Sequence, residues 1–150
     1  MEIRKVELPL IRAGFVLFTL ALLTGFAVPA VLNPRMAVAG HLTAILNALI
    51  LIVLGISWGL LAFSPLQAKL TRAAFLYGAY ASWLVSCVAA AWGTSRATPL
   101  SGAGHAAAPW QEALVQGAQV SIVLVILAAA VSVLYALRSQ PAAELASERQ

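Results

Sequence analysis

A histidine and an asparagine lie six residues apart inside an uncharged apolar run of this chain. The run extends from Gly40 to Leu60 and contains His41 and Asn47. A titratable imidazole and an amide cost free energy in hydrocarbon unless they meet a partner, a metal or a substrate. Such residues inside a membrane span are therefore candidates for a functional site. His41 is the group around which the other polar residues have to be placed.

The composition excludes an ordinary soluble domain. Of the 150 residues 62% are hydrophobic and only 9% are charged, which is too few charges to cover a water-exposed surface. The chain has no aspartate, and its single cysteine is Cys87, so a disulfide or a cysteine-based metal cluster within one chain is excluded. The net charge of +4 comes from basic residues at segment ends. That distribution is typical of membrane topology and not of a nucleic-acid-binding patch.

Four apolar runs are each long enough to cross a bilayer, which needs about 20 residues of helix. They predict an all-α, four-transmembrane-helix bundle, an integral membrane protein that forms one domain over residues 1–150. Asn33-Pro34-Arg35 is interpreted as the break after the first helix, and Ser64-Pro65 as the end of the second. A polar tail, 139–150, is expected to be flexible and cytoplasmic. The predicted helices are 10–32, 37–63, 70–92 and 111–138.

The basic residues predict the orientation of the bundle. One side would carry seven of them and the other side only two, Arg35 and Arg96. The excess places both termini in the cytoplasm and the protein in a bacterial-type inner membrane. A cleaved signal peptide ending near Val28-Pro29-Ala30 is the alternative interpretation of the first thirty residues. The seven residues are Arg4, Lys5, Arg12, Lys69, Arg72, Arg138 and Arg149.

Polar side chains of three predicted helices fall at similar depths in the non-cytoplasmic half of the bilayer, because a helix rises about 1.5 Å per residue. Their common depth predicts a polar pocket that opens toward the outside. These residues are His41, Asn47, Ser82, Ser86, Glu112, Gln116 and Gln119.

Each of these residues also has a structural interpretation. Glu112 could serve only the helix dipole, and Gln116 and Gln119 could only join helices by hydrogen bonds. Ser82 and Ser86 belong to a stripe of small residues, which favours close helix packing and contact between copies of the chain. Tyr80 and Trp83 could be core aromatics, and His105, in the connection 93–110, is expected to be solvated. Asn47 could join helices, and His41 could be a core histidine bonded to a carbonyl.

His41 by itself cannot build a zinc site, which needs three or four protein ligands. It can supply the single axial ligand of a haem, whose other four iron bonds come from the porphyrin. Gly40, Ala44 and Ala48 would leave room for a flat macrocycle against the same helix. His41, Ala44 and Ala48 are therefore the candidate cofactor-binding residues.

Several short motifs taken together resemble the hydroxylaminobenzene mutase family, over residues 34 to 138. The resemblance implies that the protein rearranges an N-phenylhydroxylamine to a 2-aminophenol by moving the hydroxyl from nitrogen to the ortho ring carbon. The motifs are Arg35-Met36-Ala37, His41-Leu42, Asn47-Ala48, Tyr77-Gly78-Ala79-Tyr80-Ala81-Ser82-Trp83, Ala91-Trp92-Gly93, Gly104-His105 and Trp110-Gln111-Glu112-Ala113-Leu114.

The spacing of His41 and Asn47 is also similar to that in styrene oxide isomerase, a four-helix membrane enzyme. This second resemblance implies a homotrimer that binds haem b, with His41 as the axial ligand of the iron and Asn47 beside the substrate. Ser82 stands where an asparagine is expected. Ser86 stands where the epoxide isomerase has a catalytic tyrosine, which counts against epoxide isomerisation here.

The sequence thus predicts a redox-neutral isomerase that uses ferric haem b as a Lewis acid. Asn47, Tyr80, Ser82 and Ser86 are the predicted catalytic set, and Trp83 and Gln116 line the substrate pocket. Glu112 is predicted to hold the second imidazole nitrogen of His41. The expected partners are a small aromatic substrate, the lipid membrane and further copies of the chain, with no nucleic acid. The alternatives are an epoxide isomerase, a non-catalytic electron-transfer haem protein and a purely structural subunit.

Overall fold

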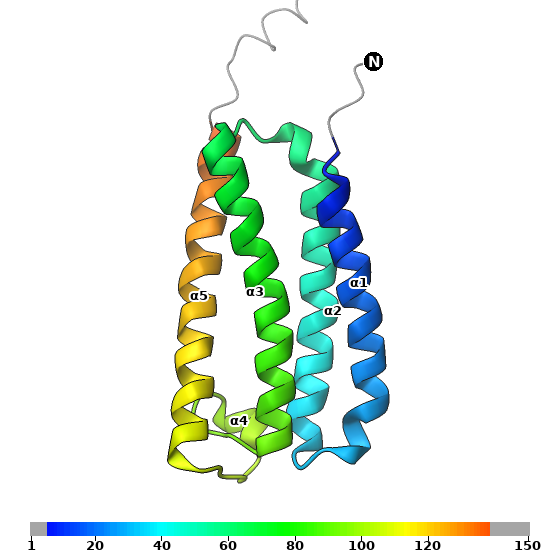
Figure 1. Ribbon diagram of the computed structural model, residues 1–150, viewed down its shortest axis with the longest axis vertical. Helices are drawn as coiled ribbons and strands as arrows, with labels where there is room; N and C mark the ends of the chain where they lie inside the picture. The colour runs from blue at the N-terminus through cyan, green and yellow to red at the C-terminus, as the bar shows by residue number, and fades with distance from the viewer. Residues whose placement is uncertain (1–5, 139–150) are drawn as a thin grey trace, which may run out of the picture.

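The computed structural model describes residues 6–138 of the chain, and within this range it is all-α, as predicted. Each long helix runs in the direction opposite to the one before it (Figure 1). Short 3-10 turns extend the first two helices, and a short helix, α4, interrupts the connection before the last one. The long helices are α1 (Leu8–Ala27), α2 (Pro34–Ser57), α3 (Pro65–Trp92) and α5 (Pro109–Arg138); the short elements are Val28–Ala30, Trp58–Leu60 and α4 (Pro99–Gly102).

Prolines begin three of the long helices, because the first helical position needs no backbone N–H and a proline φ already suits it. Asn33 and Ser64 precede Pro34 and Pro65 as N-caps, and their side chains accept hydrogen bonds from the backbone N–H groups of Met36 and Gln67. The predicted starts at 37 and 70 were therefore too late. A residue that breaks one helix can also start the next.

The long helices form a curved row and not a closed bundle. α1 packs along α2, α2 along α3, and α3 along α5 (Figure 1). At the end of α3 the chain needs a positive φ, which Gly93 supplies at 70°, with its N–H donating to the carbonyl of Ala89. Because α5 packs chiefly against α3, a groove is left between α2 and α5 along the face of α3.

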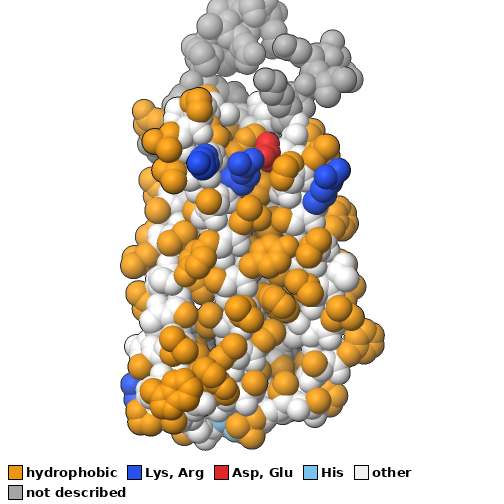
Figure 2. Space-filling model, in the orientation of Figure 1, with side chains coloured by type: hydrophobic (Ala, Val, Ile, Leu, Met, Phe, Trp, Pro, Cys, Tyr) orange, Lys and Arg blue, Asp and Glu red, His pale blue; other side chains and the backbone are white. Residues whose placement is uncertain are grey.

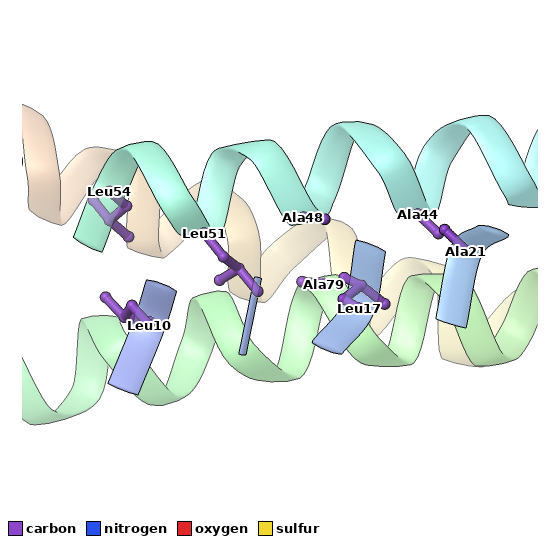
Figure 3. Packing of buried hydrophobic residues seen from close by; sticks show 8 residues of the cluster. All are labelled: Leu10, Leu17, Ala21, Ala44, Ala48, Leu51, Leu54 and Ala79. Atoms are coloured by element: carbon purple, nitrogen blue, oxygen red, sulfur yellow. The ribbon is translucent and has the colours of Figure 1, made fainter. Parts of the chain in front are cut away.

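The main core lies where α1, α2 and α3 meet (Figure 3). Alanines on α1, α2 and α3 allow the helices to approach closely, and leucines fill the space between them. Gly14 marks a close approach of α1 to α2, since a Cβ there would lie 2.8 Å from the carbonyl oxygen of Ala48. The buried residues of this cluster are Leu10, Leu17, Ala21, Ala44, Ala48, Leu51, Leu54 and Ala79.

All four long helices are long and apolar enough to cross a membrane. A broad apolar band covers the middle of the molecule, and most of the Lys and Arg side chains on the visible face gather near the start of α1 (Figure 2). At that end Arg72 donates to Glu7 across 2.7 Å. Arg4, Lys5 and Arg149, and the predicted tail 139–150, lie outside the described residues.

Candidate active site

The groove between α2, α3 and α5 holds two adjoining cavities, which share Ser82, Ile122 and Val123. The larger one, of about 410 Å³, is lined mainly by apolar side chains of the three helices and will be called the apolar cavity. The smaller one, of about 270 Å³, lies toward the α4 end and will be called the polar cavity. The polar residues that line it are Thr43, Ser82, Ser86, Thr98, Ser101 and Gln119.

Asn47 is the amide of the apolar cavity, where Ser82 is the other polar side chain. Within the described part of the chain the Asn47 side chain makes no hydrogen bond. A cavity of about 150 Å³ with apolar walls already holds benzene, so the apolar cavity has ample room for a substituted ring. An apolar cavity with one free amide is suited to bind an aromatic molecule and to orient its polar group.

The structure brings the two predicted serines and a glutamine together. Ser82 and Ser86 occupy successive turns of α3, and the Ser86 hydroxyl donates to the carbonyl of Ser82 over 2.9 Å. Gln119 of α5 lines the same polar cavity. Gln119 was singled out by its depth in the sequence, whereas Thr43 of α2, which lines the same cavity, was not.

His41 lies on a different face of α2. Its Nδ1 is 2.7 Å from the carbonyl oxygen of Ala21 on α1, and its ring packs against Gly25. Since a carbonyl can only accept, this contact assigns the proton to Nδ1 and leaves a lone pair on Nε2. At 3.6 residues per turn, His41 and Asn47 point about 120° apart around the α2 axis. One chain therefore does not bring the two residues into one pocket.

The small residues near His41 do not leave an exposed surface on which a macrocycle could lie within one chain. Ala44 and Ala48 are fully buried between α1, α2 and α3 (Figure 3), and a Cβ at Gly40 would lie 2.7 Å from the Ser86 Cβ. Within one chain, helix packing therefore already occupies the surface that these three residues were predicted to offer to a cofactor. The stripe that includes Ser82 and Ser86 also packs inside the chain: Gly78 of that stripe meets Ile126 of α5.

The two predicted aromatic walls face α1 and not the groove. The Tyr80 hydroxyl donates to the carbonyl of Ala13 over 2.8 Å, and the Trp83 indole N–H donates to the Thr24 hydroxyl over 2.9 Å. Both side chains pack on the main core. Neither side chain lines a cavity of the groove, and in this fold both join α3 to α1.

Glu112 is buried and binds backbone, not His41. Its carboxylate accepts hydrogen bonds from the N–H groups of Ser95, Arg96 and Ala107, at distances from 2.9 to 3.3 Å. The prediction that Glu112 holds the imidazole is therefore wrong, and the second imidazole nitrogen contacts Ala21 instead.

Gln116 is exposed on α5 and lines neither cavity of the groove, so its placement in the substrate pocket is also corrected. His105, predicted to be solvated, is half-buried in the connection 93–108 between α3 and α5, which will be called the outer connection after its predicted side of the membrane.

The outer connection has a second buried anchor that the sequence reasoning used only as a break. Asn33 is fully buried, and its amide donates to the carbonyls of Ser101 and Gly102, both at 3.0 Å. Together with Glu112 it holds the α4 segment over one end of the groove, where Thr98 and Ser101 line the polar cavity. An Asn directly before Pro at a helix start is the signal that could have marked it as a cap.

With the fold and the groove described, the sequence of this chain can be compared with those of known proteins. The family model described as styrene oxide isomerase matches residues 7–138. The chain belongs to the styrene oxide isomerase family. It is 37% identical over 134 residues to the protein called hydroxylaminobenzene mutase HabB of Ectopseudomonas oleovorans, which is 89% of this chain and 82% of that protein. It is 39% identical over 107 residues to hydroxylaminobenzene mutase HabA of the same organism, covering 71% of this chain and 79% of HabA. No solved structure matches.

The resemblance to styrene oxide isomerase implies haem b, and the residues of this member can be tested for that group. Among the described residues no cluster of three or more His, Cys, Asp or Glu could hold a bare metal ion. The His41 imidazole, with Nδ1–H bound to a carbonyl and Nε2 left as the ligand atom, has the arrangement that metal-binding histidines usually show. The donor therefore fits one axial position of a haem. The macrocycle would have to lie outside the packed α1–α2 contact, because Ala44 and Ala48 are buried there.

Proposed function

We propose that this protein is an isomerase that converts an N-arylhydroxylamine to a 2-aminophenol. The observation that carries the proposal is the 37% identity to hydroxylaminobenzene mutase HabB over 89% of the chain. In the reaction the N–O bond breaks, a C–O bond forms at the ortho carbon, and the proton lost from that carbon is balanced by one gained at nitrogen. No oxidant or reductant is consumed.

The groove supplies what this rearrangement needs from the protein. Cleavage of the N–O bond leaves an electron-poor aryl group that water would trap, so the apolar lining of the larger cavity has to exclude water. Asn47 would hold the substrate in one orientation through its free amide. Ser82 lies where the two cavities join, and its hydroxyl would contact the polar group of a substrate bound there.

We further propose that His41 holds haem b through Nε2. When bound, ferric haem would supply a Lewis acid for the oxygen that leaves nitrogen. The His41 Nδ1–H bond to Ala21 fixes the orientation of the ring and leaves Nε2 as the ligand atom.

A homo-oligomer is part of this proposal, and the resemblance to styrene oxide isomerase points to a trimer. His41 and the groove lie on either side of an exposed apolar strip of α2, formed by Leu42, Leu46, Leu49 and Val53. A neighbouring copy packed on this strip would bring a histidine toward a groove. We propose the cytoplasmic membrane, with both termini inside, since Arg12, Lys69 and Arg72 lie toward the end of the molecule where α1 begins.

The test is an absorption spectrum and a turnover assay on protein purified in detergent. We expect a haem spectrum with an open coordination position and conversion of phenylhydroxylamine to 2-aminophenol. His41→Ala should lose the haem and the activity, and the matched variant His105→Ala should keep both. Full haem content and full turnover in His41→Ala would refute the assignment.

Epoxide isomerisation is the second candidate, because the matching family model carries the name styrene oxide isomerase. Parallel incubation with styrene oxide decides between the two. A six-coordinate low-spin haem with no turnover of either compound would favour the electron-transfer alternative.

A further inference from the structure

The polar cavity contains hydrogen-bonding groups that the fold itself does not use. Thr43 and Ser82 each present a hydroxyl, and Gln119 presents an amide. Within the described residues none of these three side chains makes a hydrogen bond. Ser86 differs from them, because its proton is donated to the Ser82 carbonyl.

Of these three residues, Gln119 is the one that cannot satisfy its side chain by the hydrogen bond to its own helix that a serine or threonine can make. A serine or threonine in a helix can rotate its hydroxyl toward the carbonyl four residues earlier, as Thr24 does with Leu20 at 2.8 Å. A glutamine amide carries both a carbonyl oxygen and an NH₂ group, and in Gln119 neither has a partner among the described residues, although both stay accessible. A ligand that offers both a donor and an acceptor would satisfy it.

The two cavities differ in chemistry along one direction of the groove. Phe75, Ile126 and Leu127 line the apolar cavity, toward the middle of the bundle, whereas Gln119 and Ser86 line the polar one, toward α4. The shared boundary at Ser82 and Ile122 makes the groove continuous. A flat molecule with one polar end can therefore lie in it in one favoured direction.

We propose that Gln119 is a specificity-determining residue that hydrogen-bonds the nitrogen-bearing end of the substrate, with the aromatic ring in the apolar cavity. The inference rests on the proposed function and adds a second orienting residue, which acts at the polar end of the groove while Asn47 acts in the apolar cavity. An arylhydroxylamine has N–H and O–H donors as well as acceptor lone pairs, so it matches a glutamine amide. An epoxide has only an acceptor oxygen, so it can accept from the glutamine NH₂ group but cannot donate to the glutamine carbonyl oxygen.

The experiment compares binding of aniline and toluene, which have the same shape and differ by an amino group in place of a methyl group. Dissociation constants are measured by calorimetry on the detergent-solubilised full chain. Gln119→Leu should weaken aniline binding about tenfold, the size expected for a lost hydrogen bond in a dry site, while toluene binding changes less than about twofold. Gln119→Met is a second variant with a flexible side chain of similar length.

Gln116→Leu is the matched control, because Gln116 lies on the same helix, is exposed and lines neither cavity. It should leave the aniline-to-toluene ratio at the parent value. An unchanged ratio in Gln119→Leu and Gln119→Met, or a parent protein that binds aniline no better than toluene, would overturn the role of Gln119. Failure of the parent to convert phenylhydroxylamine would instead overturn the proposed function, so the two failures are distinguishable.

Discussion

Replacing Glu112 tests whether its carboxylate holds the outer connection together. Three backbone N–H groups, of Ser95, Arg96 and Ala107, donate to this side chain. Hydrogen bonds to a charged group contribute about 1.5–3 kcal/mol each in a buried setting. Ser95 and Ala107 are half-buried and Arg96 is exposed, so water can replace part of what is lost. We therefore expect Glu112→Ala to cost about 3 kcal/mol in total.

For a chain of this size such a loss corresponds to a fall in Tm of about 6–12 °C. Glu112→Gln should fall between the parent and the alanine variant, because its amide oxygen still accepts while its NH₂ group faces an N–H donor. The assay is thermal unfolding of the detergent-solubilised protein, followed by tryptophan fluorescence. Trp92 and Trp110 suit this readout, since their rings pack edge to face at 5.2 Å beside the connection.

Gln111→Ala is the control for position at the start of α5. Its side chain accepts one hydrogen bond, from the Ala108 N–H at 2.9 Å, so its loss should cost only about 1 kcal/mol. If Glu112 acted only on the helix dipole, Glu112→Ala and Glu112→Gln would cost the same, about 0.3–1 kcal/mol. A Tm for Glu112→Ala at or above that of Gln111→Ala would refute the role of Glu112 in holding the connection together.

Two further variants test the packing and the groove. Gly14→Ala should destabilise the protein by about 1–3 kcal/mol in thermal unfolding, because its Cβ would lie 2.8 Å from the Ala48 carbonyl oxygen. Gly117→Ala is the control, because nothing lies within 4 Å of the added carbon, and it should be neutral or stabilising. Equal effects of the two substitutions would contradict the close α1–α2 contact. Asn47→Leu should lower kcat/KM for phenylhydroxylamine about tenfold or more, since it removes the free amide of the apolar cavity; an unchanged kcat/KM in a folded variant would remove Asn47 from the site.

The sequence determined the class of fold, because a membrane imposes a simple rule on it. Each helix that crosses hydrocarbon must satisfy its own backbone and needs about 20 apolar residues, and such runs are visible without any structure. The charge pattern and the family motifs are likewise visible in short stretches of the sequence. His41 and Asn47 were identified as the intramembrane polar residues for the same reason, since their cost depends on the surrounding sequence and not on the fold.

The tertiary structure decided which polar groups meet. Depth along a helix follows from residue number, but the direction a side chain faces depends on which neighbour packs there. Tyr80 and Trp83 have the depth of a pocket residue and nevertheless bind α1. Glu112 has the depth of His41 and binds the outer connection. Gln116 and Gln119 lie less than one turn apart, and only Gln119 reaches the groove.

The position of α5 is the physical reason for these differences. α5 packs chiefly against α3 and not along α2 (Figure 1). The groove therefore opens between α2 and α5, and His41 lies on a different face of α2. Hydrophobic composition does not set this arrangement, because lipid and apolar side chains are equally good surroundings for a leucine. Close contacts do, such as Gly14 of α1 against Ala48 of α2 and Gly78 of α3 against Ile126 of α5, and these become visible only when the helices are placed together.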